Sequence, residues 1–431
     1  MVTGHRATHR RLRTLIAAAG AVGLALACAA PAQAATTTAD GQWWYGAYGV
    51  EQVHADGFTG EGVKIAVIDA QINPDLPVFD GADLTVAPDA GCAGTEPTSD
   101  QVSSSSRHGS TVTALLIGNG TGAGAIRGIV PDASVTFYGT GPLEGCTDSP
   151  EAQEAGVSNG VWLVSRALAD GADIISMSQG GGDWTSDVIA EAIARQVPLV
   201  FSTPNDIMTE GNFPSSYDGV VAVNAVDQDQ QLLISETFDL PNIIEETTVV
   251  APGGPFSSIG APDGTWDDSN LTQGASLATP LVAGILAAAM QKYPDATPNQ
   301  LIQSLVHNTG ADDHEIAYSP DDGFGYGVAS LGHVLRVNPT QYEDMNPLLG
   351  KNIDQPTDEQ IAEATAALAT EDPAPAASDG PPGDPGDGGD SGMLTVFVIG
   401  GIVVAVVIVA AVILTIILVR RSHRNNREGQ S

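Results

Sequence analysis

The sequence predicts an α/β fold of three layers, in which a mainly parallel sheet is flanked by helices, followed by one C-terminal transmembrane helix. Two observations carry this prediction. Short, continuously apolar segments are separated by helical segments, which is the pattern of parallel strands that are covered on both faces. Residues 394–419 form an uncharged apolar run that is long enough to cross a bilayer with some tilt.

The elements alternate along the chain in the order that such a fold requires. Strands are predicted over residues 64–68, 134–138, 173–177, 198–201 and 219–225. Helices are predicted over residues 111–117, 160–169, 186–195 and 277–290. The last of these helices is apolar nearly all round, as a helix through the middle of a domain must be, and Pro280 is expected in its first turn. In such sheets, functional sites form at the carboxyl ends of the strands.

Both ends of the chain indicate export and membrane anchoring. Arginines precede the apolar run 15–26, and Ala32-Gln33-Ala34 has the small-x-small form of a cleavage site, which predicts a secretory signal peptide over residues 1–34. Arg10-Arg11 is also a hint of twin-arginine export, so the export route stays open. Four arginines follow the C-terminal apolar run directly, which places the short tail in the cytoplasm and the bulk of the chain outside the cell membrane.

The domain organisation follows from these boundaries. Near the C-terminus, residues 357–370 predict a short helix with Thr357 and Gln360 as a capping box, and residues 372–392 predict an extended Pro/Gly/Asp-rich spacer. The predicted segments are a signal peptide (1–34), a globular domain with a short N-terminal extension (35–340), an acidic Pro/Gly-rich linker (341–392), a transmembrane helix (393–420) and a basic tail (421–431).

Composition excludes one class of partner and predicts one cross-link. The formal net charge of −36 argues against nucleic acid, because phosphate binding needs a basic face. Removal of the signal peptide leaves Cys92 and Cys146, and an even pair in an exported protein usually forms a disulfide. Two free thiols are the alternative.

Three residues form a candidate catalytic set. Asp69 ends a buried strand, His108 precedes a helix, and Ser276 opens the apolar helix behind Gly274 and Ala275. Taken singly, each has an ordinary structural explanation, such as a helix cap or a surface histidine. Together they are the residue types that activate a serine hydroxyl for attack on a carbonyl.

The segments around these residues resemble the subtilisin-like serine proteases. The resemblance rests on residues 63–69 (VKIAVID), 107–112 (RHGSTV), 175–181 (ISMSQGG) and 274–280 (GASLATP), with further landmarks at 128–133, 213–227 and 323–328. It runs in consistent order over roughly residues 53–335, and ordered agreement of this kind is far more specific than one motif. Residues 175–181 are similar to the edge strand on which members of the family pair an extended substrate.

This resemblance implies a subtilisin-like fold and a serine endopeptidase that hydrolyses polypeptides. Ser276 is expected to be the nucleophile, His108 the general base and Asp69 its orienting partner, with Asn205 as the side-chain donor of the oxyanion hole. No cofactor is required. Structural calcium is frequent in the family, but no ligand set can be located in this sequence. In layout the chain is most similar to the mycosins, membrane-anchored members that work beside type VII secretion machinery, which implies such a partner complex here.

Several positions depart from the family pattern. Ala275 stands where threonine is usual, Pro204 precedes Asn205 where glycine is usual, and Ala70-Gln71 and Ser110-Thr111 differ beside Asp69 and His108. No reacting group is missing, so an active protease is expected. The alternative is a weak or inactive scaffold that stabilises a secretion complex, and a stalked adhesin is a third reading that leaves the three residues unexplained.

Overall fold

A computed structural model describes residues 41–142, 145–180, 182–207, 213–235, 237–262, 264–351 and 355–370. All of them belong to the first of two compact units, which ends at Asp372. The predicted signal peptide (1–34), the spacer (372–392), the transmembrane helix (393–420) and the basic tail (421–431) lie outside the described residues.

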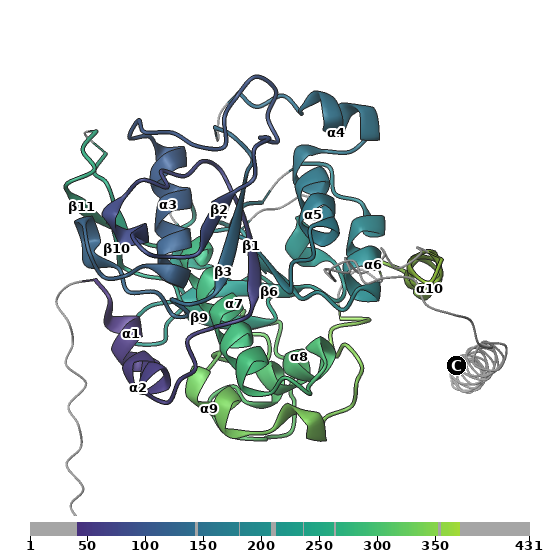
Figure 1. Cartoon of the computed structure of the whole chain (residues 1–431). Coiled ribbons are helices and arrows are strands. Elements are labelled where there is room, and N and C mark those ends of the chain that lie inside the picture. Colours follow the sequence, from purple (N-terminus) through teal and green to yellow (C-terminus); the bar gives the residue numbers. More distant parts are fainter. Residues whose placement is uncertain are drawn as a thin grey trace, which may run out of the picture. The chain divides into compact units, whose positions relative to one another are not determined.

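Helices and strands alternate through most of this unit (Figure 1). The α-helices are α1 (Trp43–Ala47), α2 (Val50–Ala55), α3 (Ser104–Ile117), α4 (Pro150–Ala155), α5 (Asn159–Ala169), α6 (Ser186–Ala194), α7 (Ala275–Lys292), α8 (Pro298–His307), α9 (Leu331–Arg336) and α10 (Asp358–Leu368). The strands are β1 (Lys64–Asp69), β2 (Leu84–Val86), β3 (Ser134–Gly139), β4 (Ile174–Met177), β5 (Leu199–Ser202), β6 (Val221–Val226), β7 (Ile234–Ser235), β8 (Leu240–Pro241), β9 (Val249–Pro252), β10 (Phe256–Ile259) and β11 (Ser269–Thr272).

The main sheet is parallel throughout its described pairs. Its seven strands lie in the order β2-β3-β1-β4-β5-β6-β9, and Asp69 at the end of β1 pairs with Gly139 at the end of β3. β1 and β4 therefore lie side by side, and their carboxyl ends face the same edge of the sheet. The predicted parallel α/β architecture is confirmed.

Side chains that alternate along the strands build a core on each face of this sheet. Ile65 and Val67 of β1 belong to the core that α3 and α7 cover, whereas Ala66 and Ile68 belong to the core beneath α5 and α6. This alternation follows from the two-residue period of a strand. The result is the three-layer arrangement of helix, sheet and helix that Figure 1 shows.

Helix α7 lies at the centre of the domain. Its side chains from Ala275 to Ala289 are all buried, and it packs against β4, β5, β6 and β9. Within the described part of the chain it is the one helix with the length and apolar composition of a membrane span, but 83% of its apolar window is buried inside the domain. It is therefore a core helix. The expected place of Pro280 in its first turn is corrected: the helix starts at Ala275, so Pro280 lies in the second turn.

Helix α3 begins seven residues before the predicted start of 111. Ser103 caps it, and the Ser103 and Ser106 side chains form a reciprocal capping box with each other's backbone N–H groups. The serine run before His108 thus starts a helix, since serine at an N-cap satisfies N–H groups that have no partner within the helix. As a consequence, His108 lies inside the helix and not before it.

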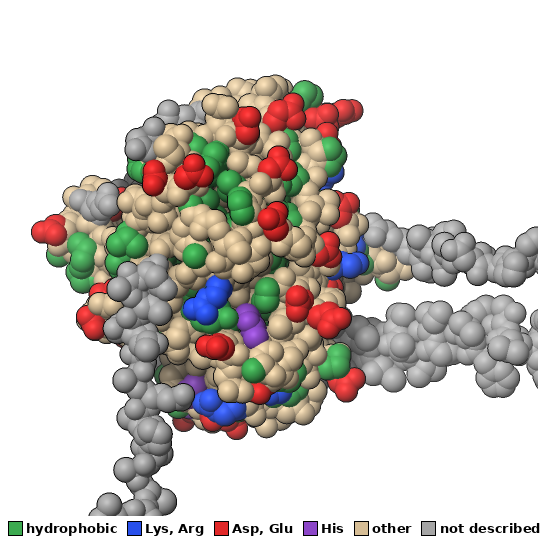
Figure 2. Space-filling view, turned by 60° about the vertical axis from the view of Figure 1, so that its left-hand side comes forward, with side chains coloured by type: hydrophobic (Ala, Val, Ile, Leu, Met, Phe, Trp, Pro, Cys, Tyr) green, Lys and Arg blue, Asp and Glu red, His purple; other side chains and the backbone are tan. Residues whose placement is uncertain are grey.

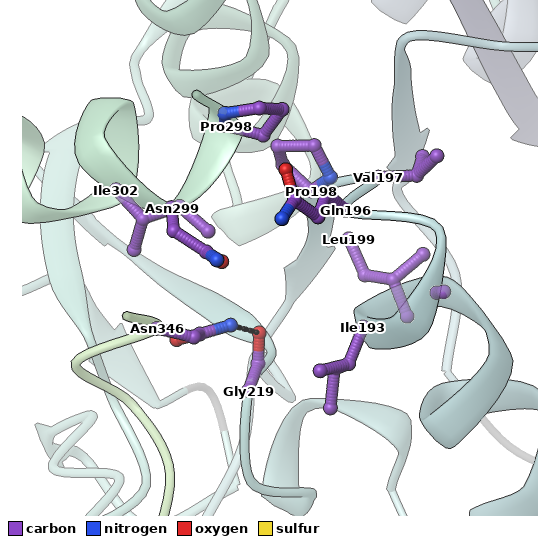
Figure 3. A pocket seen from close by; sticks show the side chains of 11 residues that line it. Ile193, Gln196, Val197, Pro198, Leu199, Gly219, Pro298, Asn299, Ile302 and Asn346 are labelled. Carbon is purple, nitrogen blue, oxygen red and sulfur yellow. Dashed lines mark hydrogen bonds between the residues drawn. The ribbon is translucent and has the colours of Figure 1, made fainter. Parts of the chain in front are cut away.

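The chain after residue 340 continues to pack on the domain. Asn346 Nδ2 donates to the Gly219 carbonyl at 3.2 Å, and Figure 3 shows this bond at a pocket that Ile193 and Asn299 also line. Helix α10 packs against α6, and its Gln360 donates to Ser186 Oγ at 2.6 Å. The predicted capping box of Thr357 and Gln360 is confirmed.

Two further features are a cross-link, of which Cys92 is buried, and the charge of the surface. Cys92 and Cys146 form the predicted disulfide. Acidic side chains are spread over the face that Figure 2 shows, with few basic ones between them, in keeping with the net charge of −36.

Candidate active site

The Asp69 and His108 side chains meet where β1 ends and α3 passes above it. Asp69 is fully buried, and its Oδ1 accepts hydrogen bonds from the Ala70 N–H at 2.7 Å and from His108 Nδ1 at 2.7 Å. The approach of α3 depends on Gly109, because a Cβ at this position would lie 2.2 Å from the Gln71 carbonyl oxygen. The glycine after His108 thus lets the helix pass close enough for the two side chains to touch.

The environment of this pair favours a charged imidazole. Burial by itself lowers the pKa of His108, but the charge and the hydrogen bond of Asp69 outweigh burial, so that the net pKa is raised above its ordinary value. Asp69 Oδ2 is buried and has no hydrogen-bond partner among the described residues. The carboxylate is therefore poorly solvated, which strengthens its attraction for a proton on His108.

Ser276 is the second residue of α7 and lines the same cavity as His108. This cavity has a volume of about 200 Å³ and includes Ser178, Gly180 and Phe213 in its wall. Ser276 itself is buried, with 8% of its surface exposed. The fold thus brings a serine at a helix N-terminus and the Asp69–His108 pair to one hollow, although they are far apart in the sequence.

Asn205 follows β5 and lines this cavity. Its Oδ1 accepts a hydrogen bond from the Ala275 N–H at 2.8 Å, which fixes the orientation of the amide. In the described part of the chain, Nδ2 has no protein partner, so its two N–H groups are available to a bound molecule. Gly274 makes room for the amide, because a Cβ there would lie 3.0 Å from both of its polar atoms.

One contact of the site was not foreseen from the sequence. The Ser178 hydroxyl donates to the Ser276 carbonyl at 2.8 Å. The usual helical bond to that carbonyl from the N–H four positions later is missing, because that residue is Pro280, which lacks an N–H. A proline four residues after the candidate nucleophile was the available sequence signal.

The positions that depart from the family pattern are integrated into hydrogen bonds. Ser110 Oγ accepts from the Asn73 N–H at 3.0 Å, and Thr111 Oγ1 accepts from the Ile259 N–H at 3.1 Å. The carbonyl of Pro204 accepts from Asn242 Nδ2 at 2.7 Å. Ala275 supplies the N–H that holds Asn205. The Ser110 and Thr111 side chains thus take part in hydrogen bonds, whereas Pro204 and Ala275 contribute through their backbone.

No metal centre accompanies this site in the described ranges. Across these residues, no group of three or more His, Cys, Asp or Glu side chains is arranged to hold a metal ion. A calcium site is accordingly not assigned.

Comparison with known proteins places the chain among the subtilases in sequence. Residues 60–327 match the model of the subtilase family. Subtilisin NAT from Bacillus subtilis subsp. natto and subtilisin E from Bacillus subtilis (strain 168) are each 30% identical over 275 residues, which is 60% of this chain. The match spans 64% of the length of either relative.

Solved structures agree on the fold. Fervidolysin from Fervidobacterium pennivorans, a keratinolytic enzyme related to subtilisin, is 22% identical with a TM-score of 0.52, covering 68% of this chain and 45% of its own. MycP1 from the ESX-1 type VII secretion system is 20% identical with a TM-score of 0.52, covering 71% of this chain and 88% of its own. At these identities the likeness concerns the fold.

Proposed function

The chain belongs to the subtilase family, and from that membership we propose that it is a serine endopeptidase that hydrolyses peptide bonds with Asp69, His108 and Ser276. The observation that carries the proposal is the hydrogen bond of 2.7 Å between His108 and a fully buried Asp69, at the wall of the cavity that Ser276 also lines. A buried carboxylate paired with a histidine beside a serine is the arrangement that converts a weak nucleophile into a reactive one.

In the proposed reaction, Ser276 Oγ attacks the carbonyl carbon of the scissile peptide while His108 Nε2 takes the hydroxyl proton. Because Asp69 holds Nδ1, the imidazole presents Nε2 to the serine and its positive charge is stabilised as it forms. His108 then gives the proton to the leaving amine, and the C–N bond breaks. Water, deprotonated by His108, attacks the acyl ester, the bond to Ser276 Oγ breaks, and His108 returns the proton to Oγ as the acid is released. This chemistry needs no cofactor.

Two donors are proposed for the oxyanion that develops on the attacked carbonyl. One is the backbone N–H of Ser276 at the start of α7, where N–H groups lack helical partners. The other is Asn205 Nδ2, which is free in the described part of the chain while Oδ1 is held by Ala275. Fixed donors of this kind stabilise the transition state without having to reorganise.

A fluorophosphonate probe tests this proposal on the full-length protein in detergent. The wild type is expected to be labelled at one serine, and Ser276→Ala is expected to abolish labelling. The alternative of a weak scaffold is favoured by Ala275 and Pro204, which differ from the family pattern beside the reacting groups. Equal labelling of wild type and Ser276→Ala would reject the protease and leave the scaffold.

The location proposed is the cell membrane, with the folded domain outside and the C-terminus in the cytoplasm. Two features of the sequence support this location. They are an apolar run at 394–419 that is followed by four arginines, and a signal-like segment at 1–34. In intact cells, an external protease is expected to digest the domain but not a tag at residue 431. A chain ended at residue 392 is expected in the medium, and its retention in the membrane would contradict the anchor.

The partner proposed is a secretion complex of the type VII kind. The layout of signal, protease domain, linker and anchor supports it, together with the fold shared with MycP1, whose name places that protein in the ESX-1 type VII secretion system. Co-purification of the full-length protein with membrane components of such a system tests the proposal, and solitary migration after mild solubilisation would count against it.

A further inference from the structure

Thr140 joins the end of β1 to the cavity wall, and its neighbour Gly141 lies against the disulfide. Thr140 directly follows β3, and its backbone N–H donates to the Asp69 carbonyl at 2.6 Å. Its side chain bonds to a different segment: Thr140 Oγ1 donates to Gln179 Oε1 at 3.0 Å. Thr140 is buried, so this bond is shielded from water.

Gln179 lies between two residues of the cavity wall, Ser178 and Gly180. Ser178 is bonded to the Ser276 carbonyl at 2.8 Å, and Gln179 is bonded to Thr140. β4 is not the expected edge strand, because it pairs with β1 on one side and β5 on the other up to Met177. Residues 178–180 continue the chain beyond these ladders, and among the described residues no backbone hydrogen bond joins them to another backbone group. Unpaired backbone groups can bind an extended peptide by main-chain hydrogen bonds.

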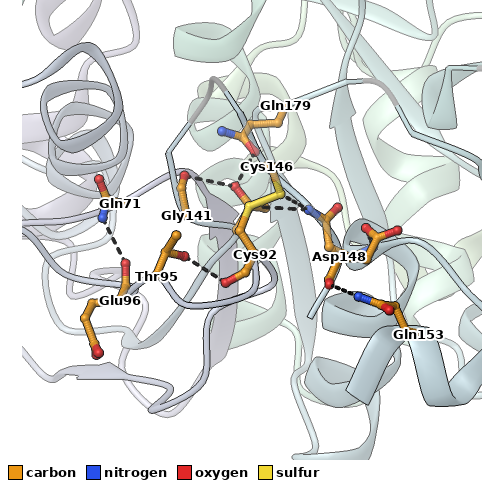
Figure 4. Close-up of a disulfide and its surroundings, with 11 residues drawn as sticks. Gln71, Cys92, Thr95, Glu96, Gly141, Cys146, Asp148, Gln153 and Gln179 are labelled. Carbon is orange, nitrogen blue, oxygen red and sulfur yellow. Dashed lines mark hydrogen bonds between the residues drawn. A yellow bond between two sulfur atoms is a disulfide. The ribbon is translucent and has the colours of Figure 1, made fainter. Parts of the chain in front are cut away.

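The disulfide lies in close contact with the loop that contains Thr140. Gly141, next to Thr140, has φ +104°, and a Cβ there would lie 2.9 Å from Cys92 Cβ and 3.0 Å from Cys92 Sγ. The Gly141 N–H donates to the Ala70 carbonyl at 2.9 Å, directly after Asp69. Figure 4 shows Gly141 and Gln179 gathered around Cys92 and Cys146. Release of the disulfide would therefore loosen the loop that holds both Thr140 and the chain after Asp69.

We propose that Thr140 is a positioning residue: it ties the peptide-binding edge Ser178–Gly180 to the end of β1, and the Cys92–Cys146 disulfide holds it there. The inference rests on the proposed endopeptidase function. It assigns to Thr140 a contribution to the binding of extended polypeptides and none to the reaction of Ser276 with a small acyl donor. The disulfide is accordingly a brace of the substrate edge as well as a cross-link of two loops.

Thr140→Val removes the hydroxyl but keeps the size of the side chain and its backbone bond to Asp69. Because Gln179 Oε1 then loses its donor, kcat/KM for fluorescein-labelled casein is expected to fall about tenfold, mainly through KM. The rate of fluorophosphonate labelling is expected to stay unchanged, because this small probe does not pair with the edge. Thr140→Ser keeps the hydroxyl and is expected to restore the wild-type value.

Thr113→Val is the matched control, because Thr113 is buried in α3 and its hydroxyl has no partner among the described residues. It is expected to leave both measurements unchanged. Gln179→Met removes the other half of the bond, so the double variant with Thr140→Val is expected to be no worse than the poorer single variant. Cys92→Ser with Cys146→Ser is expected to lower casein turnover more than the labelling rate.

The results separate the two proposals. A tenfold loss on casein with unchanged labelling supports the positioning role. Equal losses in both measurements, no loss on casein, or additive losses in the double variant overturn it. Absence of labelling in the wild type instead rejects the protease itself.

Discussion

The Ser178 hydroxyl donates to the carbonyl of Ser276 at 2.8 Å, and it is Pro280 that leaves this carbonyl open. The residue proposed as nucleophile is thus held from the wall of its own cavity. In an ordinary helix the carbonyl would be used by the N–H four residues later. Here that bond is replaced by the hydrogen bond from Ser178, which directly follows β4. This hydrogen bond joins the segment Ser178–Gly180 to the start of α7.

Ser178→Ala is expected to lower kcat/KM for casein about tenfold, because the buried Ser276 carbonyl loses its donor. Both the casein assay and fluorophosphonate labelling are expected to slow, since this bond reaches the nucleophile directly. Ser165→Ala removes a comparable hydroxyl that bonds the Val161 carbonyl within α5, and serves as the control. Wild-type labelling by Ser178→Ala would show that the bond is not needed.

Asp69→Asn is expected to reduce kcat by about 10⁴-fold, as loss of this charge does in serine proteases of another fold. The pH profile should change as well. His108 must be neutral to accept a proton, so activity falls as the pH drops through its pKa, which the wild type holds above the ordinary value of about 6.5. Without the charge of Asp69, burial lowers this pKa and the acidic limb moves to lower pH. The rate of fluorophosphonate labelling as a function of pH measures this shift. If the acidic limb of Asp69→Asn lay at the same pH as that of the wild type, His108 would be excluded as the base.

Asn205→Ala is expected to reduce kcat by about 10²–10³ with little change in KM, which is the loss known for removal of the oxyanion asparagine in a subtilisin, a member of the same family. Asn205→Asp keeps an acceptor for the Ala275 N–H but removes the donor, so it separates the two roles of the amide. If Asn205→Asp retained the wild-type kcat, Nδ2 would not be an oxyanion donor.

Lys351 provides a test of stability against pH. Burial lowers its pKa to about 7, although Asp218 and Glu246 act in the opposite direction, and its Nζ donates to the Glu246 carbonyl and Thr248 Oγ1. Between pH 7 and the ordinary lysine value of about 10.4, the unfolded chain holds more protons than the folded one. The free energy of unfolding should therefore rise with pH relative to Lys351→Met.

Urea unfolding at pH 7.0, 8.0 and 9.0 measures this difference between wild type and Lys351→Met. The wild type is expected to gain stability over the variant at each step. Parallel curves would mean that Lys351 keeps its ordinary pKa in the folded protein.

Much of the fold could be predicted because its signals are local. Parallel strands that are buried on both faces must be continuously apolar, so β1, β3, β4, β5 and β6 were found within a few residues of their observed bounds. The start of α3 was missed because serines are weak helix formers in the interior, and only the capping box reveals that they begin one here. The short helices α1 and α2 lack a long periodic pattern and were not foreseen.

By itself, the sequence determined the fold class, the family and the identities of Asp69, His108, Ser276 and Asn205 as candidates, because strand patterning and ordered motifs are properties of contiguous residues. Tertiary structure alone decided which atoms meet. The bond of 2.7 Å between His108 and Asp69, the bond of Ser178 to Ser276 and the bridge from Thr140 to Gln179 join residues 39, 98 and 39 positions apart. Contacts of this kind depend on how the helices pack on the sheet. Close packing at single residues, such as Gly109 against Gln71, decides whether these contacts form.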